Sequence, residues 1–135
     1  MRKILLATAL LLGCASDKFT PLADIPKLTS LEDVMDNQKA AADPQFAKVG
    51  QASFADADFA DFAKSAERLV VTSLKVKEFS KSYPKDPAQF EALATRLNEK
   101  AKALGTAAGA KDSAGSNTAL SDMKATCAEC HKKFR

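Results

Sequence analysis

The chain has 135 residues, enough for one domain with a hydrophobic core but too few for two. A hydrophobic content of 46% with only 5 Gly and 5 Pro excludes a disordered or collagen-like chain and favours helices. The formal net charge is +3, and two of the basic residues, Arg2 and Lys3, lie at the extreme N-terminus. The remaining charge is close to neutral, which excludes a typical nucleic-acid-binding domain.

The N-terminal residues have the pattern of an export signal. Arg2 and Lys3 precede an apolar run, residues 4–12, that is too short to span a bilayer. The run leads into Leu-Leu-Gly-Cys, which resembles the lipobox of bacterial lipoproteins. This resemblance implies a signal peptide over residues 1–13 and an acylated N-terminal Cys14; the alternative is an ordinary secretory signal with an incidental cysteine. Both interpretations predict export.

Residues 14–29 are mostly polar, and Pro21 and Pro26 interrupt any regular element. We therefore expect the acylated cysteine to continue into a flexible tether, followed by a folded domain over residues 30–135. Ala15 stands where some lipoproteins carry the aspartate that retains them in the inner membrane. The resemblance thus favours a periplasm-facing lipoprotein of the outer membrane.

The first half of the expected domain contains two helical patterns. Ser30 is a candidate N-cap for the first, and the Asp-Pro pair at 43–44 should kink or restart that helix before residues 46–49. The second helix should begin at residue 56 or 58 and end before the Tyr-Pro pair at 83–84.

The second half also contains two helices. Asp86 followed by Pro87 predicts an N-cap and a proline in the first helical turn, and the helix should end near Gly109. We expect a loop over residues 111–117 and then a last helix. Its apolar positions recur in steps of three and four: Leu120, Met123, Cys127, Cys130 and Phe134.

No strand-like alternation competes with these four patterns. Four helices joined by short loops fit an all-α, up-down-up-down antiparallel bundle, whose interior commonly holds a cofactor. The last helix should turn its cysteines toward this interior, so we expect the cofactor near the C-terminal end of that helix.

Cys127-Ala128-Glu129-Cys130-His131 is the Cys-x-x-Cys-His signature of covalent c-type haem attachment. Each cysteine would form a thioether to one vinyl group, and His131 would reach the iron. A zinc site fits less well because it normally takes four ligands, or three and a water, whereas only three candidates exist here and two of them are adjacent. A thioredoxin-like dithiol would stand at a helix N-terminus beside a parallel sheet, whereas this pair lies late in a helix.

A haem signature near the end of a four-helix pattern resembles the class II cytochromes c, the group that contains cytochrome c′ and its low-spin relatives. The closing run, residues 123–135, is the specific part of this resemblance; earlier residues match only in helix length and in the pattern around Val34-Met35. The resemblance implies one covalent haem c, with thioethers at Cys127 and Cys130 and with His131 as proximal ligand. It also makes a homodimer possible.

The sixth position of the iron determines the function. His131 is the only histidine, which excludes bis-histidine ligation within one chain. Met123 precedes it by eight residues on the same helix, about 12 Å along the axis and on the same side of the haem. Met35, near the start of an antiparallel first helix, should lie level with His131. Met35 is therefore either the sixth ligand, as in six-coordinate relatives, or an apolar plug over a five-coordinate iron.

Other side chains near the same end also have candidate roles. Phe79 and Phe90 are candidate haem walls or ordinary core aromatics. The basic residues Lys124, Lys132, Lys133 and Arg135 could dock an acidic partner, pair with haem propionates, or form a solvated face.

These observations favour a one-electron carrier rather than an enzyme, with a redox protein of the periplasm as partner and the membrane reached through the lipid. The competing hypothesis is a five-coordinate protein that binds NO or CO. A third is a structural lipoprotein without haem.

We predict that protein matured in its native host carries haem on Cys127 and Cys130. Intact-mass and peptide mass spectrometry should find one haem added and no free thiol at either cysteine. Colourless protein with two unmodified thiols would exclude every haem-based hypothesis.

Overall fold

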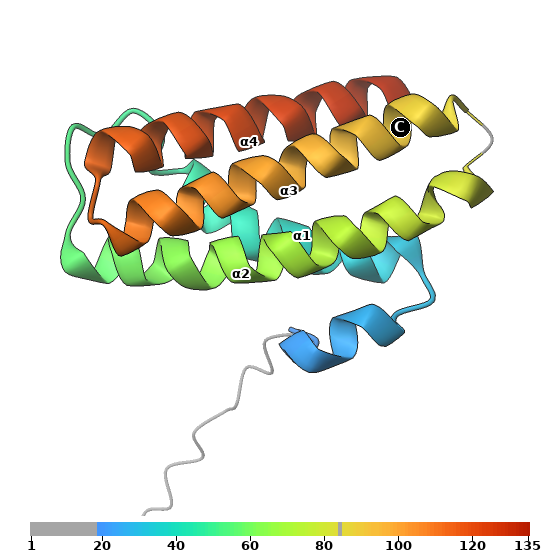
Figure 1. Ribbon diagram of the computed structural model, residues 1–135, viewed down its shortest axis with the longest axis horizontal. Coiled ribbons are helices and arrows are strands. Elements are labelled where there is room, and N and C mark those ends of the chain that lie inside the picture. Colours follow the sequence, from blue (N-terminus) through green and yellow to red (C-terminus); the bar gives the residue numbers. More distant parts are fainter. Residues whose placement is uncertain (1–18, 84) are drawn as a thin grey trace, which may run out of the picture.

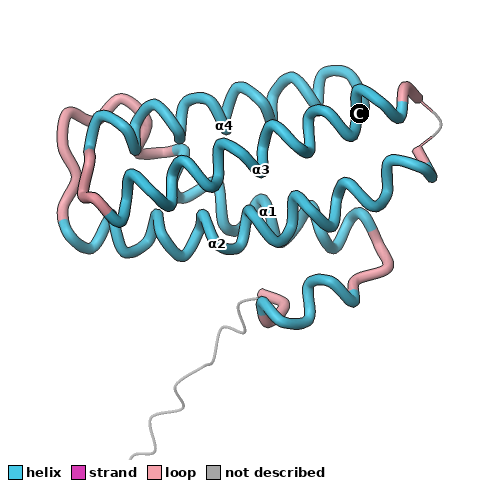
Figure 2. The backbone as a smooth tube through the Cα atoms, viewed as in Figure 1, coloured by secondary structure: helices cyan, strands magenta, loops and turns pink. Residues whose placement is uncertain are grey.

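The computed structural model describes residues 19–83 and 85–135, so the export signal and Cys14 lie outside the described residues. Its four long helices are α1 (Leu31–Phe46), α2 (Asp56–Glu78), α3 (Pro87–Gly109) and α4 (Ser113–Phe134). Two short 3-10 helices, η1 (Leu22–Lys27) and η2 (Phe79–Ser82), complete the order. Within the described ranges there is no strand (Figure 2). The predicted all-α class is confirmed.

The helices form an up-down-up-down bundle (Figure 1). Consecutive helices pack along one another, whereas α1 and α4, the first and last, contact each other much less. The start of α1 and the end of α4 lie at the same end of the bundle, as the antiparallel arrangement requires. This weakly closed seam between α1 and α4 is where the candidate site lies.

Two clusters of buried side chains fill the bundle. The larger one includes Phe62, Leu104 and Leu120, and the half-buried Cys127 packs against it. The smaller one lies at the end of the bundle where α4 ends; the half-buried Met35 and Cys130 pack against it. Its buried members are Val34, Val76, Phe90, Leu93, Ala94 and Phe134. The two cysteines therefore stand on either side of the boundary between the clusters.

Two predicted helix starts are confirmed by their capping bonds. The Ser30 hydroxyl accepts a hydrogen bond from the Asp33 backbone N–H at the start of α1. The Asp86 carboxylate accepts from the Gln89 N–H at the start of α3, with Pro87 in the first turn. Asp86 does so in the left-handed region, at φ +47°, which aspartate tolerates better than most residues.

The predicted restart of the helix at residues 43–44 is not found, because α1 runs unbroken to Phe46 with Pro44 in its last turn. The hydrogen bond that Pro44 cannot donate would have gone to the carbonyl of Ala40. Ala40 is exposed, so water can replace that bond, and the helix loses little by continuing.

The predicted loop over residues 111–117 is also wrong, because α4 begins at Ser113. The Asp112 carboxylate accepts a hydrogen bond from the Gly115 N–H and caps the helix there. Serine, glycine and asparagine in this segment are compatible with a first helical turn once the cap is in place.

The second half of the predicted tether, residues 14–29, is folded onto the bundle instead of being flexible. Residues 22–27 form η1, which packs against α2 and buries Ile25 completely, with 0% of its surface exposed. Just before it, the Thr20 carbonyl accepts from the Arg68 guanidinium, and the Thr20 N–H donates to the Asn37 side chain. The described chain is thus attached to the bundle from residue 20 onward.

Asp86 also joins two helices, because it accepts a hydrogen bond from the Lys133 ammonium at the end of α4. That bond, followed by the one from Gln89, lowers the pKa of the Asp86 carboxyl. A pKa lowered on folding means that the carboxylate stabilises the fold above its unfolded pKa of about 4 and loses this contribution as pH falls through the folded pKa.

We therefore expect Asp86→Asn to unfold at lower urea concentration than the wild type near pH 7, since the amide keeps the cap but loses the ion pair. The difference between the two midpoints should be smaller at pH 3 than at pH 7, because the wild-type carboxyl becomes increasingly protonated as pH falls toward its folded pKa. Urea titrations followed by circular dichroism at both pH values measure this, with the exposed carboxylate Asp61→Asn as control. The same difference between wild-type and Asp86→Asn midpoints at both pH values would contradict a stabilising ion pair between Asp86 and Lys133.

Candidate functional site

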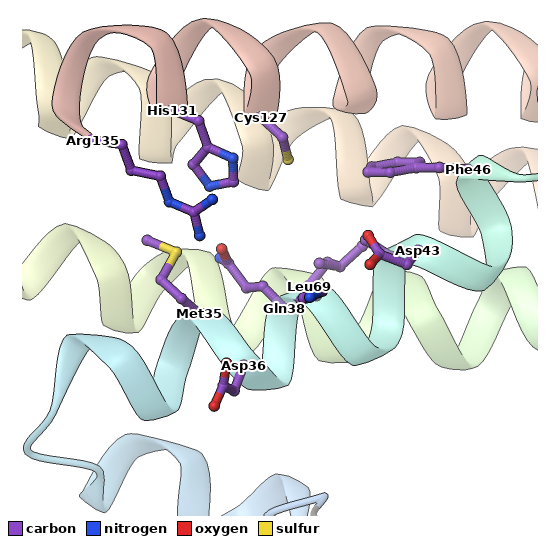
Figure 3. A pocket seen from close by; sticks show the side chains of 11 residues that line it. Met35, Asp36, Gln38, Asp43, Phe46, Leu69, Cys127, His131 and Arg135 are labelled. Carbon is purple, nitrogen blue, oxygen red and sulfur yellow. The ribbon is translucent and has the colours of Figure 1, made fainter.

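The last turns of α4 present two thiols and one imidazole toward α1. Cys127 and Cys130 are half-buried free thiols, and His131 comes directly after them. In Figure 3 the His131 ring extends from α4 toward α1, and the Met35 side chain extends from α1 toward it. The structure therefore brings together the three residues of the attachment signature and the methionine predicted to face them.

Three adjoining cavities lie at the seam between α1 and α4. Their volumes are about 280, 30 and 350 Å³. Met35 and His131 line all three, so every one of these spaces is bounded by both side chains. The smallest is walled by apolar groups of α2 and α3, namely Val76, Leu93, Ala94 and Leu97.

The electrostatics of the signature residues suit attachment and ligation better than thiol redox chemistry. Burial, with smaller contributions from Cys130 and Asp43, raises the pKa of the Cys127 thiol to about 11. Burial, and then the Glu129 carboxylate, also raises the pKa of Cys130. Neither thiol is a thiolate at neutral pH, whereas dithiol oxidoreductases depend on a lowered thiol pKa.

His131 has the opposite shift. Burial lowers its pKa, and the nearby Arg135 guanidinium lowers it further. A lowered pKa favours the neutral imidazole, which is the form that binds a metal. In the part of the chain that the structure describes, no cluster of three or more His, Cys, Asp or Glu side chains could hold a metal ion by itself. The zinc alternative therefore has no support in these residues.

The comparison with known families agrees with this geometry. The family model described as Cytochrome C′ matches residues 31–135, from the first residue of α1 to the end of the chain. The chain belongs to the cytochrome c′ family. No curated protein and no solved structure matches it.

Cytochromes of this family hold a covalent c-type haem, and the residues present fit that group. The thiols of Cys127 and Cys130 would hold it and His131 would face the iron, while apolar walls and the Met35 thioether enclose the same space. The structure adds a second indication, because the amide nitrogen of Gln38 is buried at this cavity without a hydrogen-bond partner.

The two aromatic residues predicted as haem walls have different positions in this cytochrome c′ fold. Phe90 is 2% exposed and lines the third cavity, where its ring stacks on Tyr83 and meets Phe134 edge-on. Phe79 packs on the smaller core cluster, with the Lys75 ammonium over its ring, and it is not among the residues lining the three cavities. The aromatic wall consists of Phe90, Tyr83 and Phe134.

Gln38 is the site residue that sequence reasoning missed. Four side chains line both the first and the second cavity: Met35, Gln38, Cys127 and His131. The helical periodicity places Gln38 on the buried face of the first helix and assigns it no further role. An amide on an otherwise apolar helix face, one turn after the candidate methionine, is the signal that could have found it.

The basic residues at the end of α4 do not form one continuous free patch. Lys133 is bonded to Asp86, and Arg135 lines the first and third cavities. Lys39 of α1 lines the first cavity with Arg135, so two cationic side chains stand at its margin. Lys124 and Lys132 are exposed.

Proposed function

We propose that this protein is an exported, single-haem c-type cytochrome that carries one electron at a time, with His131 and Met35 as the two axial ligands. The observation that carries the proposal is that Met35 and His131, from the first and last helices, together line all three cavities described above. The haem would supply the one-electron ferric/ferrous couple, and methionine ligation raises the potential of that couple.

The contribution of the chain is to hold these groups in place. The thioethers at Cys127 and Cys130 would keep the cofactor on α4 whichever oxidation state it has. The aromatic wall of Phe90 and its neighbours fixes the end of α4, because the Tyr83 hydroxyl donates a hydrogen bond to the Phe134 carbonyl. A pre-built cage of this kind limits structural reorganisation when an electron is gained or lost.

The second candidate function is binding of NO or CO by a five-coordinate iron. In that case Met35 only shields the iron, and the half-burial of its side chain at an apolar cavity is the observation in favour. Such a plug would have to move aside for the ligand. The two functions make opposite predictions for the ferric spectrum.

We expect the ferric wild-type protein to show the methionine-to-iron charge-transfer band at the red end of the visible spectrum and to bind CO poorly when reduced. Met35→Ala should abolish the band, produce a high-spin ferric spectrum and bind CO readily. Met123→Leu is the matched control, because Met123 is fully buried in the larger core cluster and lines none of the three cavities. A high-spin wild type that binds CO as readily as Met35→Ala would establish the second function instead.

The proposed location is the periplasmic side of the outer membrane, with acylated Cys14 as the anchor. In the part of the chain that the structure describes, none of the helices combines the length and apolarity needed to cross a membrane. Cys14 precedes Phe19 by five residues, which span at most about 18 Å. Since η1 packs on α2, such an anchor would hold the α2 side near the membrane and leave α4 accessible to a redox partner.

Cys14→Ser should therefore move the cytochrome from the membrane fraction to the soluble periplasmic fraction with its visible spectrum unchanged. Fractionation of the native host and mass spectrometry of the N-terminal peptide measure this. An ordinary secretory signal predicts no acyl group on the wild-type cysteine and the same soluble distribution for both proteins.

A further inference from the structure

Gln38 is a buried polar side chain whose donor group has no partner. It is 9% exposed, and its amide nitrogen, Nε2, has no hydrogen-bond partner. A buried donor without an acceptor is unfavourable, so each such group in a folded protein needs a reason. The reason here should lie in the space that Gln38 faces.

The surroundings of Gln38 place it at the site itself. It borders the first and second cavities together with Met35, Cys127 and His131. In Figure 3 its amide group points from α1 into the space beneath the His131 ring, beside the Met35 thioether. It is one helical turn from Met35 on the same face of α1, so the two side chains approach the space opposite His131 together.

We propose that the Gln38 Nε2–H group is a hydrogen-bond donor for a small ligand with an acceptor atom, such as a diatomic molecule or a halide, bound opposite His131 when Met35 does not occupy that position. This rests on the proposed placement of the haem between α1 and α4, and it adds a second function for the same face of α1. Met35 closes the position, and Gln38 stabilises the ligand that enters when it is open.

The charges around the cavities favour a small neutral or singly charged ligand over the carboxylates of the haem. Charged side chains of both signs line the first cavity and none of them lines the second: Lys39, Arg135, Asp36 and Asp43. A haem carboxylate is best compensated by the cationic pair at the exposed margin, because a neutral amide alone is a poor partner for a buried charge. The second cavity, which Gln38 also borders, has mostly apolar walls.

The test uses holoprotein in the Met35→Ala background, which opens the position, and compares Gln38 with Gln38→Leu and Gln38→Ile. Both replacements remove the donor and approximately keep the volume, and neither leaves a new buried polar group. Gln45→Leu is the matched control, because Gln45 is a second buried glutamine of α1, 7% exposed and with an unpartnered oxygen, that lines none of the three cavities.

Fluoride binding to the ferric protein and the infrared C–O stretch of the ferrous carbonyl protein are the readouts. We expect both Gln38 variants to bind fluoride about 5- to 10-fold more weakly, the effect of losing one hydrogen bond, and to raise the C–O stretching frequency. Gln45→Leu should leave both unchanged. Unchanged fluoride affinity and C–O frequency in the Gln38 variants would overturn the proposal.

A change in reduction potential without a change in either ligand readout would also overturn it, because Gln38 would then be bonded to the haem carboxylates. The outcome for Met35 is measured separately, from the charge-transfer band of the ferric wild type. If that band is missing, Met35 is not a ligand, yet the fluoride and carbonyl measurements still decide the role of Gln38.

Discussion

The site depends on one constraint, which is that α1 and α4 run antiparallel at the open seam of the bundle. This arrangement brings Met35, near the start of one helix, opposite His131, near the end of the other. Consecutive helices pack closely, whereas this first-to-last pair has few contacts and leaves cavities between its side chains. A group held by α4 can therefore be enclosed from α1 without any change in the fold.

The end of α4 would fray if it were held only by its own helical bonds, since the last turn of a helix has unpaired carbonyls. Here the Tyr83 hydroxyl donates to the Phe134 carbonyl, and Lys133 reaches Asp86 at the start of α3. Phe134 adds an edge-on contact with Phe90. These contacts surround His131 without involving its ring, so they fix the backbone that carries it and leave the imidazole free to face α1.

Periodicity and strong local motifs account for the features that the sequence predicted correctly. The helix class and the caps at Ser30 and Asp86 are all local patterns. The predictions at Pro44 and at residues 111–117 are wrong because a proline or a cluster of polar residues breaks a helix only where the affected backbone groups find no other partners. Ala40 is exposed, so water can reach its carbonyl, and the Asp112 carboxylate caps the start of α4. The docking of Ile25 could not be predicted, because its partner surface on α2 is distant in sequence.

Gln38 illustrates a different limit, because its identity is visible in the sequence and its significance is not. Three buried side chains have a polar atom without a partner in the described part of the chain: Gln38, Gln45 and Ser116. Each is expected to cost about 1–3 kcal/mol, so an unpaired group by itself says only that something is missing. Position separates Gln38 from the others, since it alone of the three lines the cavities that Met35, Cys127 and His131 share. The Gln38 amide nitrogen is unpaired in the folded chain and faces the proposed binding site. Its cost is removed only when a bound ligand brings an acceptor atom. The same hydrogen bond would then link the stability of the fold to binding of the ligand.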